Sequence, residues 1–233
     1  MNELILRESD NKDITTYAGS IETSGKLLLS LVNEVLDFSK VESGKMELIP
    51  VNYSFRNMIS DMATVAYNHC EEKGLEFSYQ IADNIPSVLY GDELRVKQVI
   101  MNLLTNAVKY TEKGFVKLIV SATVNVDDCI LSITVSDSGQ GIKEEEMPRL
   151  FGSFVRLDQK NNRNIVGTGL GLSLIKSYAE MMGGKVSVKS AYGKGSSFNV
   201  KVIQKVVNAA PVGSFNPLIA SEHLQTSRRG TII

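Results

Sequence analysis

The stretch that organises this sequence opens with DSGQGI at residues 137–142 and closes with GTGLGL at residues 167–172. The first hexapeptide ends an alternating apolar run, and the second leads into a predicted helix. Glycine lets a backbone approach a ligand closely, and the free N–H groups at a helix N-terminus attract phosphate. The pair of turns therefore suggests a nucleotide site. Neither matches the P-loop or the Rossmann glycine pattern, and glycines taken alone favour simple turns.

The segment before these turns predicts a helix that is capped by Asp92 and has apolar residues at three- and four-residue spacing. At about 100° per residue, the polar residues fall on one opposite stripe: Arg95, Gln98, Asn102, Asn106 and Lys109. Asparagine offers an oxygen to a metal ion and lysine a charge to phosphate, so the stripe could hold a magnesium–nucleotide complex. Each of these residues alone is better explained as part of a solvated polar face.

Two β-rich segments, residues 115–126 and 129–135, predict a hairpin around Asp127 and Asp128. The second strand carries Asp137 to its end, where a carboxylate can accept a hydrogen bond from the exocyclic amine of adenine. A turn-forming aspartate before Ser-Gly is the alternative. Residues 143–156 are charged and predicted helical, and residues 152–166 are polar enough to form a lid of low local stability.

The N-terminal region predicts a helical hairpin with a shortened first arm. Residues 1–7 fit the end of one helix and residues 8–13 a polar connection, and the apolar residues from Ile14 to Phe38 then follow heptad spacing. This seam is either half of a dimeric four-helix bundle or a helix laid on its own domain. We expect residues 1–47 to form this partial hairpin and residues 48–206 an α/β domain. Residues 207–233 are expected to form a linker or disordered tail.

Composition excludes several classes of protein. The 233 residues carry a net charge of −1, which gives no electrostatic footprint for nucleic acid or an anionic membrane. The longest apolar runs are too short to cross a bilayer, so we expect a cytoplasmic protein without direct membrane contact. Cys70 and Cys129 lack metal-ligand or redox spacing and fit reduced packing residues.

Four motifs in order resemble the asparagine, first glycine, phenylalanine and second glycine boxes of bacterial sensor histidine kinases. They are NLLTNAVKY at 102–110, DSGQGI at 137–142, FGSF at 151–154 and GTGLGL at 167–172. LDFSKVESGK at 36–45 is similar to the second dimerisation helix of such kinases. QKVV at 204–207 and PVG at 211–213 loosely resemble the exit of a hybrid kinase towards a receiver domain. The resemblance implies a two-layer α/β sandwich with a mixed sheet.

The resemblance also implies roles for individual residues. Asn106 would bind magnesium, and Asn102, Lys109 and Tyr110 would line the phosphate and ribose side of ATP. Asp137 would accept the adenine amine, and Arg156 would reach the γ-phosphate. Asn102, Lys109 and Arg156 are the expected catalytic residues. The remaining nucleotide contacts would come from the boxes: Gly139, Gly141, Ile142, Phe154, Gly167, Thr168, Gly169, Leu170, Gly171 and Leu172.

One departure from the family is the absence of a histidine followed by an acidic residue and Arg-Thr-Pro. His69 precedes Cys-Glu-Glu and His223 precedes Leu-Gln, so this chain is expected to donate phosphoryl to a histidine that it does not contain. The expected partners are such a histidine on a dimerisation domain, a receiver domain, and a second copy bound through residues 14–38. A plain ATPase, a serine kinase of the anti-sigma type and a non-enzymatic decoy remain alternatives.

Overall fold

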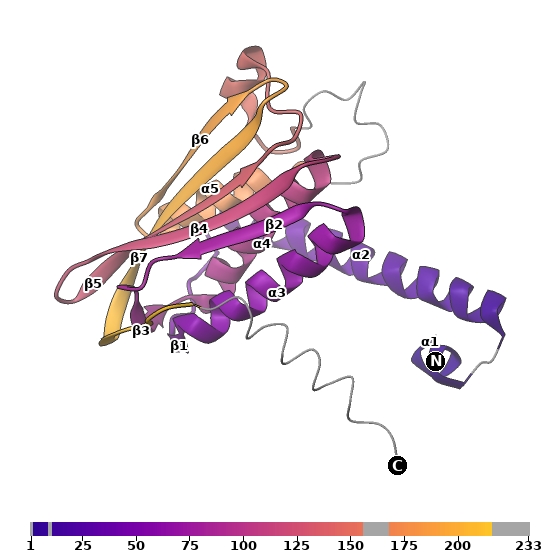
Figure 1. Ribbon diagram of the computed structural model, residues 1–233, viewed down its shortest axis with the longest axis horizontal. Coiled ribbons are helices and arrows are strands. Elements are labelled where there is room, and N and C mark those ends of the chain that lie inside the picture. The colour runs from indigo at the N-terminus through magenta and orange to yellow at the C-terminus, as the bar shows by residue number, and fades with distance from the viewer. Residues whose placement is uncertain (1, 9–10, 156–167, 216–233) are drawn as a thin grey trace.

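The computed structural model describes residues 2–8, 11–155 and 168–215 as a two-layer α/β sandwich preceded by a helical hairpin (Figure 1). This confirms the expected fold class. The seven-stranded sheet has the order β1-β3-β7-β5-β4-β2, and β6 pairs with the N-terminal part of β7 outside this order. Its strands are β1 (Val51–Ser54), β2 (Glu76–Ile81), β3 (Pro86–Gly91), β4 (Phe115–Val124), β5 (Asp128–Asp137), β6 (Lys185–Ala191) and β7 (Gly195–Pro211).

The sheet is mixed because β2 runs parallel to β4 while the other neighbours are antiparallel. The predicted hairpin of β4 and β5 is confirmed, and it places Val116 opposite Asp137. Buried and half-buried residues alternate along β5, which is the pattern of a strand with one face against helices. Asp137 is the last residue of this buried row, so the strand delivers its carboxylate to the rim of the core.

Three helices cover one face of the sheet: α3 (Phe55–Lys73), α4 (Glu93–Tyr110) and α5 (Gly171–Met181). The predicted caps are confirmed, since Ser54 accepts a hydrogen bond from the amide of Asn57 and Asp92 from that of Arg95. The apolar face of α4 is buried against the sheet, as its spacing predicts: Val96, Val99, Ile100, Leu103, Leu104 and Ala107. The opposite stripe of α4 is thereby turned away from the sheet.

The N-terminal hairpin consists of α1 (Asn2–Glu8) and α2 (Lys12–Glu42). Asn11 caps α2, and the side chain of Asn2 donates to the carbonyl of Ala18. Figure 1 shows the first half of α2 projecting from the sandwich while its C-terminal part lies against it. The C-terminal part of the heptad seam lies on its own domain, because Phe38 packs on the core. Tyr17 and Ile21, on the projecting part, are exposed, and their pairing with a second copy stays a prediction.

The C-terminal strand continues to Pro211, beyond Val206, where the sequence led us to expect the domain to end. Pro211 lies opposite Pro86, and the amide of Val212 donates to the carbonyl of Ile85. Arg56 donates to the carbonyl of Val212 and stacks on Phe215. Residues 207–215 are thus part of the fold. Residues 207–211 are all exposed in the structure. Their sequence therefore lacks the alternation of apolar and polar residues from which a half-buried strand is predicted.

Two other segments differ from the sequence prediction. β3, which the sequence did not suggest, begins at Pro86 and fills the place between β1 and β7. The charged segment after Lys143 forms only a 3-10 helix, η1 (Glu144–Arg149), followed by turns. Pro148 lies inside it, and a proline without an N–H group does not continue an α-helix.

The two cysteines are free and buried, as predicted. Burial raises the pKa of Cys70, and raises that of Cys129 to about 11, which keeps both thiols protonated and unreactive at neutral pH. Among the described residues, no helix is long and apolar enough to cross a bilayer.

Candidate nucleotide site

A cavity of about 510 Å³ lies between α4, the two glycine turns and the C-terminal part of α2. It brings together many of the predicted site residues, listed from the N-terminus: Asn102, Asn106, Lys109, Tyr110, Asp137, Gly141, Ile142, Thr168, Gly169, Gly171 and Leu172. These residues come from separate elements, and the fold alone places them around one volume. The cavity is therefore the candidate ligand site.

The polar stripe of α4 divides into two halves. Asn102, Asn106 and Lys109 are half-buried and line the cavity. Arg95 and Gln98, nearer the start of the helix, point instead to Asp37 of α2. One helix face therefore serves two tasks. Its C-terminal half lines the cavity, and its N-terminal half binds another helix.

Asp137 sits at the mouth of the first glycine turn with 8% of its surface exposed. Its Oδ1 accepts hydrogen bonds from the amides of Gly139 at 2.9 Å and Ser196 at 3.3 Å. Burial raises the pKa of Asp137, and the two backbone hydrogen bonds oppose that rise. The carboxylate is thus oriented by its backbone and lines the cavity, where it can accept a further hydrogen bond.

The first glycine turn is held by the turn between β6 and β7. The amide of Gly193 donates to the carbonyl of Gln140 at 2.7 Å, and the amide of Ile142 donates to Ser190 at 2.9 Å. Gly141 has a φ of +67°, and a Cβ there would lie 2.1 Å from the carbonyl oxygen of Ala191. Only glycine fits this position, because the backbone of the first glycine turn passes close to that of Ala191 at the cavity wall.

The second glycine turn leads into α5. Gly169 has a φ of +75°, and a Cβ there would meet Val155 and Phe154 at 2.9 Å. The amides of the first turn of α5 have no acceptor within their own helix, which is the arrangement that binds anions. Gly171 lies near Asn102, whose Nδ2 would be 3.8 Å from an added Cβ. The α5 N-terminus and the asparagine stripe therefore face the same end of the cavity.

Comparison with known proteins identifies this arrangement. Residues 91–205, which contain most of the cavity, match the family described as histidine kinase-, DNA gyrase B-, and HSP90-like ATPase. The chain carries a histidine kinase ATPase domain.

Curated relatives place the domain among two-component sensor kinases. It is 40% identical over 189 residues to hybrid signal transduction histidine kinase B of Dictyostelium discoideum, covering 80% of this chain and 10% of that protein. It is 35% identical over 183 residues to the signal transduction histidine-protein kinase BarA of Escherichia coli, covering 78% of this chain and 20% of BarA. The chain thus spans a fifth or less of the length of these relatives.

A solved structure shares the fold beyond the ATPase domain. The crystal structure of full-length ShkA in complex with AMPPNP has a TM-score of 0.68 and 28% identity to this chain, covering 93% of this chain and 43% of ShkA. This coverage is much greater than residues 91–205, so the similarity extends beyond the ATPase domain. The likeness to that structure is therefore one of fold over most of this chain.

Some predicted contacts of the histidine kinase domain are placed elsewhere. Gly139 packs beneath the turn, where an added Cβ would lie 2.3 Å from the carbonyl of Tyr110. Leu170 is buried under the start of α5. Phe154 is 60% exposed with a φ of 60°, and its ring meets Phe38 of α2 edge-on at 5.4 Å. None of the three lines the cavity. Arg156, Gly167 and most of the predicted lid lie outside the described residues.

The sequence did not suggest several residues that line the cavity of the kinase domain. Glu146 closely follows the first glycine turn, whereas Tyr192 lies in the turn between β6 and β7 and Phe198 in β7. A further group comes from α2, far away in the sequence: Leu27, Ser30, Leu31 and Glu34. The heptad spacing predicts that α2 packs on something, but it carries no sign that this is the nucleotide cavity. The helix forms one wall of the site.

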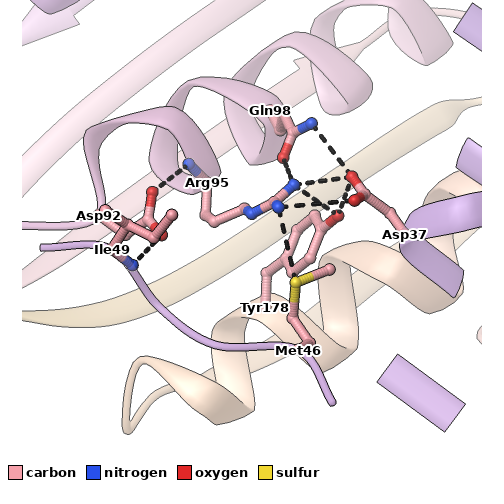
Figure 2. Close-up of polar contacts among 7 residues, drawn as sticks. All are labelled: Asp37, Met46, Ile49, Asp92, Arg95, Gln98 and Tyr178. Atoms are coloured by element: carbon pink, nitrogen blue, oxygen red, sulfur yellow. Dashed lines mark hydrogen bonds and ion pairs between the residues drawn. The ribbon is translucent and has the colours of Figure 1, made fainter. Parts of the chain in front are cut away.

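A polar cluster fastens α2 to the kinase domain next to this wall (Figure 2). We call Asp37, Arg95, Gln98 and Tyr178 the Asp37 cluster. Asp37 Oδ2 lies 2.7 Å from Arg95 Nη1 and accepts from the Tyr178 hydroxyl at 2.8 Å, while Arg95 also donates to Gln98 at 2.6 Å. The side chains of Arg95 and Asp37 are only 12% and 15% exposed. Burial, and then the hydrogen bond to Asp37, raises the pKa of Tyr178, so its hydroxyl remains a donor.

Proposed function

We propose that this domain binds Mg-ATP in the cavity and transfers the γ-phosphoryl group to a histidine outside this chain. The observation that carries the proposal is the meeting of Asp137, the α4 stripe and the N-terminus of α5 around one cavity. Each supplies the chemistry that one part of ATP requires. The membership in the histidine kinase ATPase family and the AMPPNP bound by ShkA support the same ligand.

The proposed roles follow the geometry. Asp137 accepts the exocyclic amine of adenine, because its carboxylate is oriented by two amides and faces the cavity. Gly141 and Ile142 form the wall beside the base. Lys109 and Tyr110 lie on the ribose and phosphate side, and the amides of Gly169, Gly171 and Leu172 lie where the phosphates would run.

The donor set also fits magnesium. Asn106 and Asn102 present amide groups to the cavity, and magnesium in nucleotide sites takes few protein ligands because phosphates and water complete its shell. Among the described residues there is no group of three or more His, Cys, Asp or Glu side chains that could hold a metal alone. We propose Asn106 as the protein ligand. When bound, the ion would neutralise phosphate charge.

Transfer is favoured over hydrolysis by the residue one turn before Asn106. Asn102 stands on the same face of α4 and, as an amide, cannot deprotonate water at neutral pH. Phosphoryl transfer needs mainly positioning and charge neutralisation, and a neutral imidazole is already nucleophilic. Slow hydrolysis is the second candidate, because carboxylates of Glu34 and Glu146 also line the cavity.

The first test is incubation with γ-labelled ATP. We expect no label on His69 or His223, and acid-labile label on the histidine of a separately supplied kinase dimerisation domain. Asn106→Ala should reduce the magnesium-dependent transfer by at least tenfold, the effect of losing roughly 1.4 kcal/mol of binding. Label on His69 would contradict the proposed acceptor. Fast phosphate release without transfer would favour the ATPase alternative.

We also propose that α2 pairs with a second copy of the chain. Tyr17 and Ile21 on the projecting half of the helix are 68% and 63% exposed, and Leu28 just beyond it is 62% exposed. Such a stripe is unfavourable in water and suits a helical bundle. Light scattering should give a dimer mass that falls to that of a monomer in Ile21→Lys/Leu28→Lys. A monomer in the unmodified protein would contradict the proposal.

A receiver domain as the final phosphoryl acceptor is proposed from the hybrid kinase relatives.

A further inference from the structure

Glu34 of α2 reaches the phosphate end of the cavity, where no motif of the sequence predicts an acidic residue. It lines the cavity together with Asn102, Gly171 and Thr168. Its Oε2 accepts a hydrogen bond from the hydroxyl of Thr168 at 2.5 Å. Thr168 belongs to the second glycine turn, directly before α5. A negative charge from α2 therefore stands beside the loop to which we assign the phosphates.

The hydroxyl of Thr168 connects Glu34 to a backbone amide. While its proton points to Glu34, its oxygen accepts the N–H of Leu170 at 3.2 Å. Leu170 is the residue that precedes the first turn of α5. One amide at the helix N-terminus is thus already engaged, through a threonine whose orientation a carboxylate sets. Both the charge and the engaged amide make this end of the cavity less receptive to an anion.

The charges around the cavity increase the effect. Among the described residues that line it, Glu34, Asp137 and Glu146 are acidic and Lys109 is basic. Asp137 belongs to the end to which we assign the base, so its charge acts less on the phosphates. Glu34 is placed where repulsion of a triphosphate would be strongest.

Glu34 is held at this place by the contacts next to it on α2. Asp37, less than one helical turn further on, is fixed by Arg95 and Tyr178, and Phe38 packs on Phe154. The carboxylate cannot swing away by a helix movement unless these contacts break. Its position in the cavity is therefore a property of docked α2 rather than of a freely rotating surface side chain.

We infer that Glu34 is an autoinhibitory contact through which docked α2 opposes the phosphates of the nucleotide. The inference rests on the proposed ATP site and adds a coupling to it. Because coupling between two binding events is reciprocal, phosphate-bearing nucleotides should also weaken the docking of α2. The unfavourable effect of Glu34 on binding depends on the charge of the phosphates. It should therefore be absent for adenosine, which has the base and ribose alone.

Calorimetric titration of the full chain with adenosine, ADP and ATP tests this inference. Glu34→Gln removes the charge while its amide oxygen can still accept the Thr168 hydroxyl. We expect it to raise the affinity for ATP roughly fivefold or more, within the usual range of such couplings, and the affinity for ADP less. Adenosine binding should be unchanged. Glu42→Gln, an exposed glutamate at the end of the same helix, is the matched control and should bind all three as the unmodified protein does.

The outcomes separate this inference from the proposed function. ATP affinity that is equal in Glu34→Gln and the unmodified protein overturns the autoinhibitory contact and leaves the ATP site standing. A gain that is as large for adenosine as for ATP also overturns it, because charge would not be the cause. Absence of ATP binding in both proteins overturns the proposed function itself. Urea unfolding of each variant checks that the fold is retained.

Discussion

Replacing Asp137 with asparagine is expected to weaken the binding of ATP and ADP alike by about 1–3 kcal/mol, the cost of a lost charge-assisted hydrogen bond. Both nucleotides should be affected equally because the carboxylate is assigned to adenine, which they share. An asparagine could still accept from the amides of Gly139 and Ser196, so the turn should keep its shape. Calorimetry of both nucleotides measures the effect, and unchanged affinities would refute the assignment.

The same substitution should not destabilise the nucleotide-free protein. Burial raises the pKa of Asp137 above its ordinary value, so the folded state holds a proton more tightly than the unfolded state. Ionisation of Asp137 therefore lowers the free energy of unfolding. This loss of stability develops as the pH rises from the ordinary aspartate pKa through the raised pKa of the folded state. At neutral pH Asp137→Asn removes that cost. We expect an equal or higher free energy of unfolding in urea, and a clear decrease would show that the carboxylate is structural.

Arg95→Ala is expected to release the C-terminal part of α2 from the kinase domain. The substitution leaves Asp37 with Tyr178 but without its cation, and breaking a buried ion pair costs about 3–5 kcal/mol. The side chains of Arg95 and Asp37 are 12% and 15% exposed, so water screens the pair in part and the expected cost is at the lower end of that range. About 3 kcal/mol corresponds to roughly a 100-fold loss of hydrogen-exchange protection in residues 34–42.

The control for Arg95→Ala is Lys97→Ala on the same helix. Lys97 lies 2.8 Å from Glu93, with side chains 30% and 29% exposed, and such surface pairs contribute less than about 1 kcal/mol. Protection in α2 should therefore be unaffected by that variant. Amides of β5 should keep their protection in both proteins. If residues 34–42 exchange no faster in Arg95→Ala, the Asp37 cluster does not hold the helix.

Local patterns were sufficient to predict much of the fold. The alternation along β4 and β5 and the spacing of α4 each have a single physical solution, which is one face against a core. The caps at Ser54 and Asp92 followed from side chains that bond to their own backbone. β3 escaped prediction because it is short and begins with a proline, and its place depends on strands far away in the sequence.

The site was predictable only where one element carried the information. Asn102, Asn106 and Lys109 share a helix face, so their convergence could be read from spacing. That Arg95 and Gln98 on the same face bind α2 could not, because it depends on Asp37, far from them in the sequence. The wall formed by Ser30 and Glu34 was hidden for the same reason.

The extension of β7 moves the last fixed residue of the described chain beyond Val206. Residues 207–215 are fixed by contacts with Ile85, Arg56 and Tyr79, so the chain stays on the sandwich through Phe215 instead of leaving it at Val206. Phe215, which contacts Arg56 and Tyr79, is therefore a fixed origin on α3 and β2. The same strand borders the nucleotide cavity at Ser196 and Phe198, which joins that origin to the site by one continuous element.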